Sequence, residues 1–82
     1  MKIEYSKQAR KDIKILNEPI KSRVQVGINK LPEGDIKKLV GRDGYYRIRI
    51  GDYRVVFEVV APEEIIIWGV APRGQIYKRG YK

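Results

Sequence analysis

The sequence predicts an α+β fold, with two N-terminal helices packed on one face of a small, mostly antiparallel four-stranded sheet. Two segments with helical apolar spacing come first, over residues 7–16 and about 18–31. Strand-like segments follow within residues 45–70, and the first two of them are joined by a two-residue turn. Helices grouped before strands are typical of this class. With 82 residues, the chain is expected to form a single domain over residues 1–82, in the order strand, helix, helix and three strands.

The N-terminal third of the chain predicts a strand and a helical hairpin. Residues 2–5 alternate between polar and apolar and end where Ser6 can cap a helix. Asn17 is a favourable N-cap for the second helix, expected from about Glu18 to Leu31, and proline is tolerated in its first turn. The apolar stripes expected to face the core are Ala9, Ile13 and Leu16 in the first helix, and Ile20, Val24, Ile28 and Leu31 in the second.

Residues 45–59 predict a β-hairpin whose turn is Gly51-Asp52. Glycine at the first central position suits a type II′ turn. A two-residue loop sets Ile50 opposite Tyr53 and Arg49 opposite Arg54. One face of the hairpin is then an apolar core surface made of Tyr46, Ile48, Ile50, Tyr53, Val55, Phe57 and Val59, whereas the other face carries Arg47, Arg49 and Arg54.

The remaining segments complete the predicted sheet. Residues 36–40 are expected to form one more helical turn, and Gly44 a turn before the hairpin. Residues 65–70 are apolar without alternation, which is typical of a strand inside a sheet and covered on both faces. The first strand is expected at the sheet edge or beside this last strand. Residues 73–82 are expected to contain a short helical turn, and the face with the arginines is expected to stay open.

The three arginines on one face favour an anion site. Arg49 directly opposite Arg54 is unfavourable for stability, because like charges across a ladder repel. Guanidinium groups fit phosphate oxygens and stay charged at physiological pH. The alternative is an ordinary solvated sheet face, which antiparallel sheets commonly have.

Composition restricts the chemistry and the partners. The chain has no cysteine and no histidine, so disulfides, thiolate or imidazole metal ligands and a histidine general base are excluded, and we expect no metal and no cofactor. A net charge of +8 favours an acidic partner, with nucleic acid ahead of an acidic protein or a membrane surface. No apolar run approaches the roughly 20 residues of a membrane span. The start lacks a signal-peptide pattern, so we expect a cytoplasmic protein without membrane contact.

The hairpin and the C-terminal segment resemble the RelE/ParE superfamily of toxin–antitoxin toxins. The resemblance covers nearly the whole chain and is most specific in Gly41-Arg42-Asp43-Gly44-Tyr45-Tyr46-Arg47-Ile48-Arg49-Ile50-Gly51-Asp52-Tyr53-Arg54-Val55-Val56-Phe57 and in Val70-Ala71-Pro72-Arg73-Gly74-Gln75-Ile76-Tyr77. It implies a RelE-like microbial ribonuclease fold. It also implies a ribosome-dependent endoribonuclease that cuts messenger RNA in the A site of the small (30S) ribosomal subunit and is neutralised by a cognate antitoxin.

The resemblance also assigns roles to individual residues. In RelE-type toxins, two basic strand residues and an arginine after the turn surround the scissile phosphate, and these correspond to Arg47, Arg49 and Arg54. A further arginine and a C-terminal catalytic tyrosine correspond to Arg73 and Tyr77. Many relatives have a His-Arg-basic-acidic run before that tyrosine, whereas this chain has Pro72-Arg73-Gly74-Gln75.

The residues themselves suggest a matching chemistry. RNA cleavage by its own 2′-hydroxyl needs a base, cations for the phosphorane and an acid for the leaving oxygen. A phenol has a pKa of about 10 in water, and nearby guanidinium groups favour its charged form. Tyr77 is therefore the candidate base or acid and the arginines are the candidate stabilisers. Tyr77 could instead cover the core edge, Tyr81 could take its role, and Tyr46 and Trp68 are expected in the core.

Two other functions remain open from the sequence. ParE-type toxins of the same superfamily act on DNA gyrase, and fold alone does not separate the two activities. A non-catalytic module that binds RNA or the ribosome would also use the basic face. An antitoxin could lie across the helices or the basic face as an acidic or amphipathic peptide, or could add a strand to a sheet edge.

Overall fold

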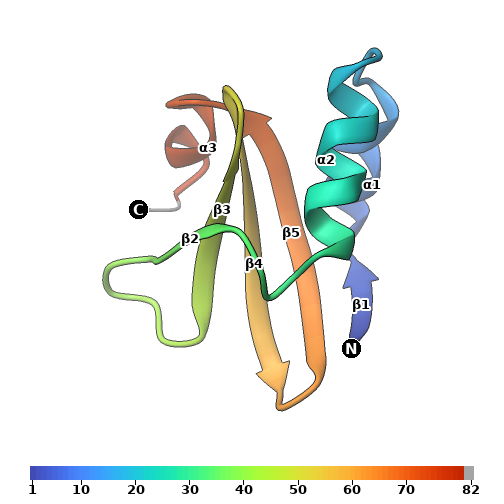
Figure 1. Cartoon of the computed structure of the whole chain (residues 1–82). Coiled ribbons are helices and arrows are strands. Elements are labelled where there is room, and N and C mark those ends of the chain that lie inside the picture. The colour runs from blue at the N-terminus through green and yellow to red at the C-terminus, as the bar shows by residue number, and fades with distance from the viewer. Residues whose placement is uncertain (81–82) are drawn as a thin grey trace.

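Helices cover both faces of a five-stranded sheet in the computed structural model of the chain, which describes residues 1–80 (Figure 1). The predicted α+β class and the predicted order of the N-terminal elements are confirmed. In chain order the elements are β1 (Lys2–Tyr5), α1 (Lys7–Lys14), α2 (Ile20–Asn29), β2 (Asp35–Lys38), β3 (Tyr45–Ile50), β4 (Tyr53–Ala61), β5 (Glu64–Pro72) and α3 (Gln75–Lys78).

The strands are arranged in the order β1-β5-β4-β3-β2. Strand β1 runs parallel to β5 at one edge, and all other neighbours are antiparallel. The first strand was expected at the sheet edge or beside the last strand, and the structure shows both. Strand β5 lies inside the sheet between β1 and β4, as its continuous apolar sequence predicted.

The prediction of four strands and a helical turn over residues 36–40 is wrong, because Asp35–Lys38 forms the fifth strand, β2. It pairs antiparallel with β3, with Ile36 opposite Ile48 and Lys37 opposite Arg47. A single helical turn fixes many dihedral angles for very few hydrogen bonds. The free edge of β3 instead offers a full ladder, and in that ladder Ile36 packs against the core beneath α2.

The hairpin has the predicted register at every pair from Ile50–Tyr53 to Tyr46–Phe57. Gly51 has φ +58°, as the first central residue of a type II′ turn requires. The Tyr46 ring stacks on Phe57 with centroids 5.6 Å apart, which confirms that Tyr46 is a core residue. The prediction that Val59 is also core is wrong, because its side chain lies at the irregular end of β4 and is 38% exposed.

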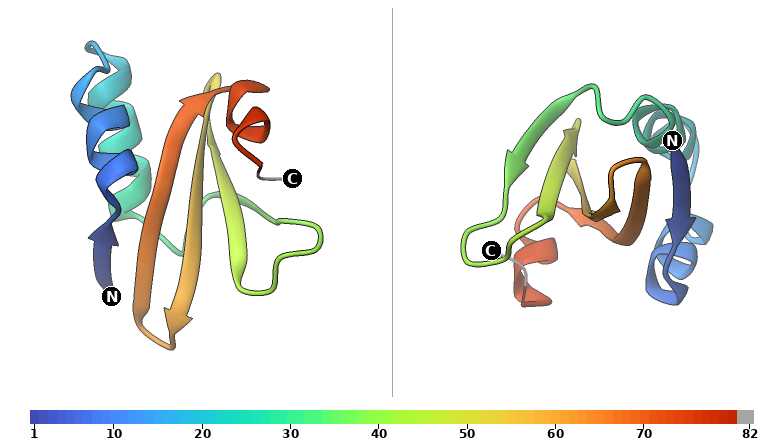
Figure 2. Two further views of the ribbon diagram at one scale, coloured as in Figure 1. Left: turned by 180° about the vertical axis from the view of Figure 1, so that it is seen from behind. Right: turned by 90° about the horizontal axis from the view of Figure 1, so that it is seen from below.

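The two N-terminal helices pack their apolar stripes against one face of the sheet, as predicted (Figure 2). Ser6 caps α1, its Oγ accepting a hydrogen bond from the Ala9 amide at 3.0 Å. The start of α2 differs from the prediction: the Glu18 carboxylate, and not the Asn17 side chain, accepts the Ser22 amide, at 3.0 Å. Both helices are shorter at their ends than predicted. The buried residues of this first core are Ala9, Val24, Ile28, Leu31, Ile48, Val55, Phe57, Ile65, Ile67 and Val70.

The short helix α3 covers part of the opposite face, so the prediction that this face is open is wrong (Figure 1). Ile76 of α3 is fully buried and packs with Leu39, Val56 and Ala71 in a second core, with Tyr45 and Trp68 at its margin. The expected core role of Trp68 is confirmed, and its indole also donates to Glu58 at 3.0 Å. None of the helices within residues 1–80 is long and apolar enough to cross a membrane.

Candidate functional site

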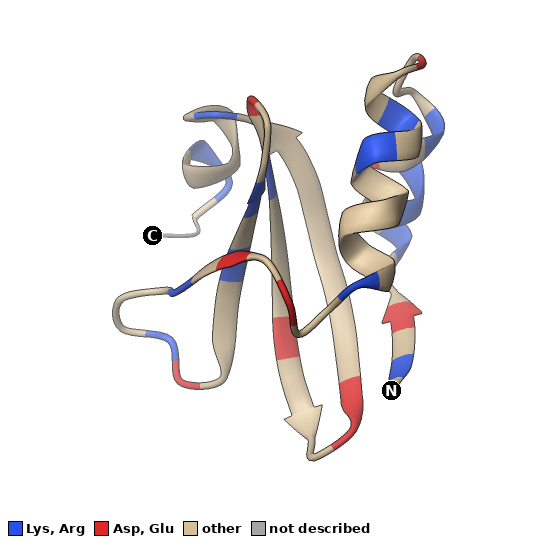
Figure 3. Ribbon diagram, in the orientation of Figure 1, with Lys and Arg blue, Asp and Glu red and all other residues tan. Residues whose placement is uncertain are grey.

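Four cations lie on the sheet face opposite α1 and α2, and we call this set the arginine face: Lys37, Arg47, Arg49 and Arg54. Strand alternation and register arrange them in two neighbouring rows. One row runs across four strands through Asp35, Arg49, Arg54 and Ala71, and the next through Lys37, Arg47, Val56 and Gly69. Figure 3 shows these basic positions on β3 and β4 beside α3. The predicted clustering of the three hairpin arginines is therefore observed.

Arg54 is buried, with only 6% of its surface exposed. Its Nη1 donates to the backbone oxygens of Gly51 and Tyr53, at 3.2 and 3.1 Å. These two hydrogen bonds stabilise the hairpin turn. Its charge acts on the arginine face from a fixed, largely desolvated position, where electrostatic effects are stronger than in water.

Arg47 is held by the edge strand. Its side chain is 12% exposed and donates to the Asp35 backbone oxygen at 3.2 Å, with the Asp35 carboxylate 3.8 Å away. The carboxylate offsets part of its charge. A phosphate at Arg47 would therefore compete with Asp35.

Arg49 is the exposed arginine of the hairpin. It lies between Asp35 on β2 and the buried Arg54 on β4. The nearby Asp35 carboxylate forms its ion pair with Arg47 and not with Arg49. Arg49 is therefore the guanidinium group of this row that is best placed to bind a ligand from solvent.

The segment that contains Arg73 and Tyr77 follows β5 and lies beside the hairpin turn and the arginine face. The Arg73 amide donates to the Asp52 oxygen at 2.7 Å, so the end of β5 is tied to the hairpin turn, and the Arg73 side chain is exposed. Tyr77 is on α3 directly after the buried Ile76, and it is 39% exposed. The structure thus brings the segment carrying Tyr77 onto the same face as the hairpin arginines. Tyr81, the alternative to Tyr77, lies outside the described residues.

Lys37 is a basic residue of this face that sequence reasoning missed. It is exposed and lies directly opposite Arg47. The signal was the alternation in Asp35-Ile36-Lys37, which sets a lysine on the face opposite an apolar residue if the segment is a strand.

An ion pair between the buried Asp12 and the exposed Arg79 was also missed. Asp12 is 4% exposed, and its carboxylate accepts the Val70 amide at 2.9 Å and two guanidinium contacts from Arg79 at 2.6 and 3.1 Å. Burial raises the pKa of Asp12, but hydrogen bonds from Arg79, Val70 and Gln8 and the charge of Arg79 outweigh it and hold that pKa below its ordinary value. The sequence signal was an aspartate on the apolar stripe of α1, beside Ala9 and Ile13.

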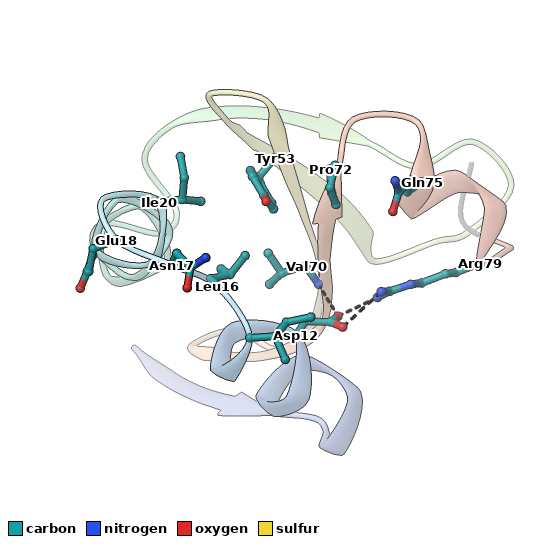
Figure 4. A pocket seen from close by; sticks show the side chains of 11 residues that line it. Asp12, Leu16, Asn17, Glu18, Ile20, Tyr53, Val70, Pro72, Gln75 and Arg79 are labelled. Atoms are coloured by element: carbon teal, nitrogen blue, oxygen red, sulfur yellow. Dashed lines mark hydrogen bonds and ion pairs between the residues drawn. The ribbon is translucent and has the colours of Figure 1, made fainter.

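A cavity of about 430 Å³ lies apart from the arginine face (Figure 4). It is bounded by the α1–α2 turn, the hairpin end and α3, with Leu16, Ile20, Tyr53 and Pro72 among its lining residues. Among its described lining residues, the one cation is Arg79, which is already paired with Asp12. Within residues 1–80, no group of three or more acidic side chains is arranged to hold a metal ion. The candidate site on the arginine face thus offers guanidinium groups and the Lys37 ammonium group, with the Tyr77 hydroxyl on the adjoining α3.

Comparison with known proteins identifies the family. Residues 3–77 match the ParE toxin of the type II toxin–antitoxin system parDE. Toxin RelE3 of Methanocaldococcus jannaschii is 35% identical over 85 residues, which cover 94% of this chain and 96% of the relative. The RelB–RelE antitoxin–toxin complex from Methanococcus jannaschii contains a chain that matches with a TM-score of 0.77 and 32% identity, over 93% of this chain and 96% of that chain. The toxin–antitoxin complex RelBE2 from Mycobacterium tuberculosis shares the fold, with a TM-score of 0.64 and 22% identity over 88% and 96% of the two chains. The chain therefore belongs to the RelE/ParE superfamily of toxins of type II toxin–antitoxin systems.

Proposed function

We propose that this toxin is a ribosome-dependent endoribonuclease that cleaves messenger RNA in the ribosomal A site. The observation that carries the proposal is the exposed Arg49, set beside two further arginines on the face onto which α3 brings Tyr77. The net charge of +8 favours an RNA or ribosomal partner. The RelE toxins among its relatives agree with this choice.

The proposed reaction uses the 2′-hydroxyl of the RNA as nucleophile. The 2′-oxygen forms a bond to phosphorus, the bond from phosphorus to the 5′-oxygen breaks, and the products are a 2′,3′-cyclic phosphate and a 5′-hydroxyl. One proton leaves the 2′-hydroxyl and another reaches the 5′-oxygen, and Tyr77 is the proposed base or acid for one of these transfers. Arg49 and Arg73 contact the phosphate from the exposed side, while Arg47 and Arg54 add positive charge from fixed positions.

The ribosome is expected to supply what this set of groups lacks. A phenol and guanidinium groups are weak acid–base catalysts near neutral pH. Holding the messenger strand in an in-line geometry can replace much of that deficit, because orientation alone removes a large part of the barrier. We therefore expect very little cleavage of naked RNA.

Primer extension on programmed ribosomes tests the proposal. The wild-type chain should produce A-site cuts that are absent with naked RNA, and Tyr77→Phe should weaken them at least 100-fold while leaving the fold intact. Tyr46→Phe is the matched control, because it removes a hydroxyl from a ring whose contribution is the stack on Phe57. Cleavage that survives in Tyr77→Phe contradicts the role of Tyr77, and no cuts under any condition contradict the nuclease activity.

Inhibition of DNA gyrase is the second candidate function, because the matching family is described as ParE toxins. A gyrase supercoiling assay separates the two activities. A gyrase inhibitor should block supercoiling in the absence of ribosomes and tolerate the loss of the Tyr77 hydroxyl. A chain that binds ribosomes without cutting RNA and leaves gyrase active would instead be a binding module.

We further propose that a cognate antitoxin neutralises this toxin, since solved relatives are antitoxin–toxin complexes. Strand β2 is an outer edge of the sheet and carries Lys37 and Lys38. Such an edge accepts an added strand with acidic side chains. Co-expression with the candidate antitoxin should restore growth, and mixing the two should give a complex that elutes earlier in size-exclusion chromatography.

A further inference from the structure

Helix α3 is too short to be stable by itself. It has only four residues, from Gln75 to Lys78, and a helix of this length is far below the length that persists in water. Its position must therefore come from its contacts. Three anchors flank Tyr77 in the sequence. They are the buried Ile76 before it, the ion-paired Arg79 after it, and the Gly80 backbone oxygen, which accepts a hydrogen bond from Arg42 at 3.2 Å.

The second anchor crosses the edge of the sheet. Strand β1 ends at Tyr5, opposite Ile67, so the next part of β5 has no strand beside it on that edge. Helix α1 takes this place, and the Asp12 carboxylate accepts the Val70 amide that β1 leaves without a strand partner. The same carboxylate binds Arg79, the C-cap residue directly after α3, through two guanidinium contacts, as Figure 4 shows. One side chain thus links α1, β5 and the end of α3.

Gly69 leaves room for this link. A Cβ atom at position 69 would lie 3.2 Å from Arg79 Nη1 and 3.5 Å from Asp12 Oδ2. It would also lie 3.6 Å from Ile76 Cδ1. A side chain at position 69 would therefore occupy space that the Arg79 guanidinium group and the Ile76 side chain now use.

We infer that the Asp12–Arg79 ion pair is a positioning device for Tyr77, fixing α3 over the arginine face so that the phenol is held at the scissile phosphate. This inference rests on the proposed function for its catalytic consequence. Its mechanical part, the fixing of α3 by the pair, stands on the contacts alone. Asp12 and Arg79 contact no reacting atom in this scheme, so they are positioning residues.

The test combines backbone dynamics with cleavage kinetics on the full chain. In Arg79→Ala, NMR order parameters of residues 75–78 should fall from rigid values of about 0.85 to below about 0.6. The A-site cleavage rate at saturating ribosomes should fall at least tenfold, with less than a threefold change in KM, because the substrate-binding arginines are untouched. Arg79→Lys should give intermediate values, since an ammonium group cannot make the two-point contact.

Arg23→Ala is the matched control, because it removes the same charge from an exposed site on α2. It should leave both readouts at the wild-type level. If Arg79→Ala does not fold, Asp12→Asn and Arg79→Lys carry the same test. Asp12→Asn keeps one oxygen as an acceptor for the Val70 amide, but it loses the charge and replaces the other acceptor of Arg79 and Gln8 by an NH2 donor.

Each outcome separates the inference from the proposed function. Rigid residues 75–78 in Arg79→Ala overturn the inference, whatever the activity. A mobile α3 with unchanged cleavage also overturns it, because Tyr77 would then need no positioning. A wild-type chain that cuts no RNA refutes the proposed function, and the order parameters alone then decide whether the pair fixes α3.

Discussion

Arg49 and Arg54 face each other across β3 and β4, yet their environments predict different effects of their substitution on stability. Arg54 is 6% exposed and donates to two backbone oxygens of the hairpin turn. Arg54→Gln loses these charge-assisted hydrogen bonds and should cost about 2 kcal/mol of unfolding free energy. For a domain of this size, that loss corresponds to a decrease in melting temperature of about 10 °C.

Arg49→Thr should leave stability almost unchanged. The substitution removes a repulsion from Arg54 worth about 0.2–1 kcal/mol and an attraction to Asp35 of similar size at an exposed site. Threonine also suits a strand. The two terms nearly cancel, and we expect a net change within about 0.5 kcal/mol in either direction. Cleavage, however, should fall at least 100-fold if Arg49 contacts the phosphate.

Urea denaturation followed by fluorescence of Trp68, the single tryptophan, measures the stability terms. This side chain lies at the margin of the second core and reports on that face directly. Primer extension on programmed ribosomes measures activity for the same samples. A loss of more than about 1 kcal/mol in Arg49→Thr, or full cleavage by that variant, refutes the assignment of Arg49 as the exposed ligand of the phosphate.

Two further predictions concern charges that the sequence did not reveal. The pKa of Asp12 is lowered in the folded chain, so its stabilising contribution should be complete above about pH 5 and disappear as the pH falls through the lowered value. In urea titrations from pH 7 to 3, the stability advantage of wild type over Asp12→Asn should therefore shrink, and an advantage that grows toward acid pH would contradict the sign. Lys37→Ala should weaken ribosome binding by about threefold to tenfold and leave stability unchanged, because Lys37 is an exposed cation opposite Arg47. Equilibrium pelleting with ribosomes measures the binding, and equal binding by wild type and variant would place Lys37 outside the contact surface.

The sequence predicted the hairpin well because its signals are local. Alternation from Tyr46 to Ile50, the glycine in the turn and the two-residue loop together determine one register, and all of these are visible within a dozen residues. The helix stripes were equally local. The clustering of Arg47, Arg49 and Arg54 on one face followed from that register alone.

The misses that affect the sheet and the candidate site depended on partners distant in the sequence, whereas the start of α2 was a local miss. Residues 35–38 form a strand because they pair with the free edge of β3, and the local sequence does not reveal that this edge is available. Asp12 was unremarkable until Val70 and Arg79, 58 and 67 residues away, supplied its hydrogen bonds. The burial of Arg54, which is 6% exposed, was also hidden, because an arginine on the polar side of a strand is ordinarily expected to face solvent.

The sheet face that carries the arginine face and the second core combines packing with the proposed chemistry. Over β4 and β5 it is apolar, with Val56 and Ala71 under Ile76, whereas over β2 and β3 it is basic. Strand β4 contains both kinds of residue, since Arg54 and Val56 are two positions apart on the same side. The proposed reacting groups therefore stand at the boundary of a dry core and a charged surface. A positive charge interacts more strongly beside a low-dielectric core than in open water. We therefore argue that α3 contributes to the proposed chemistry in two ways: it carries Tyr77, and it excludes water from the side of the arginines next to the second core.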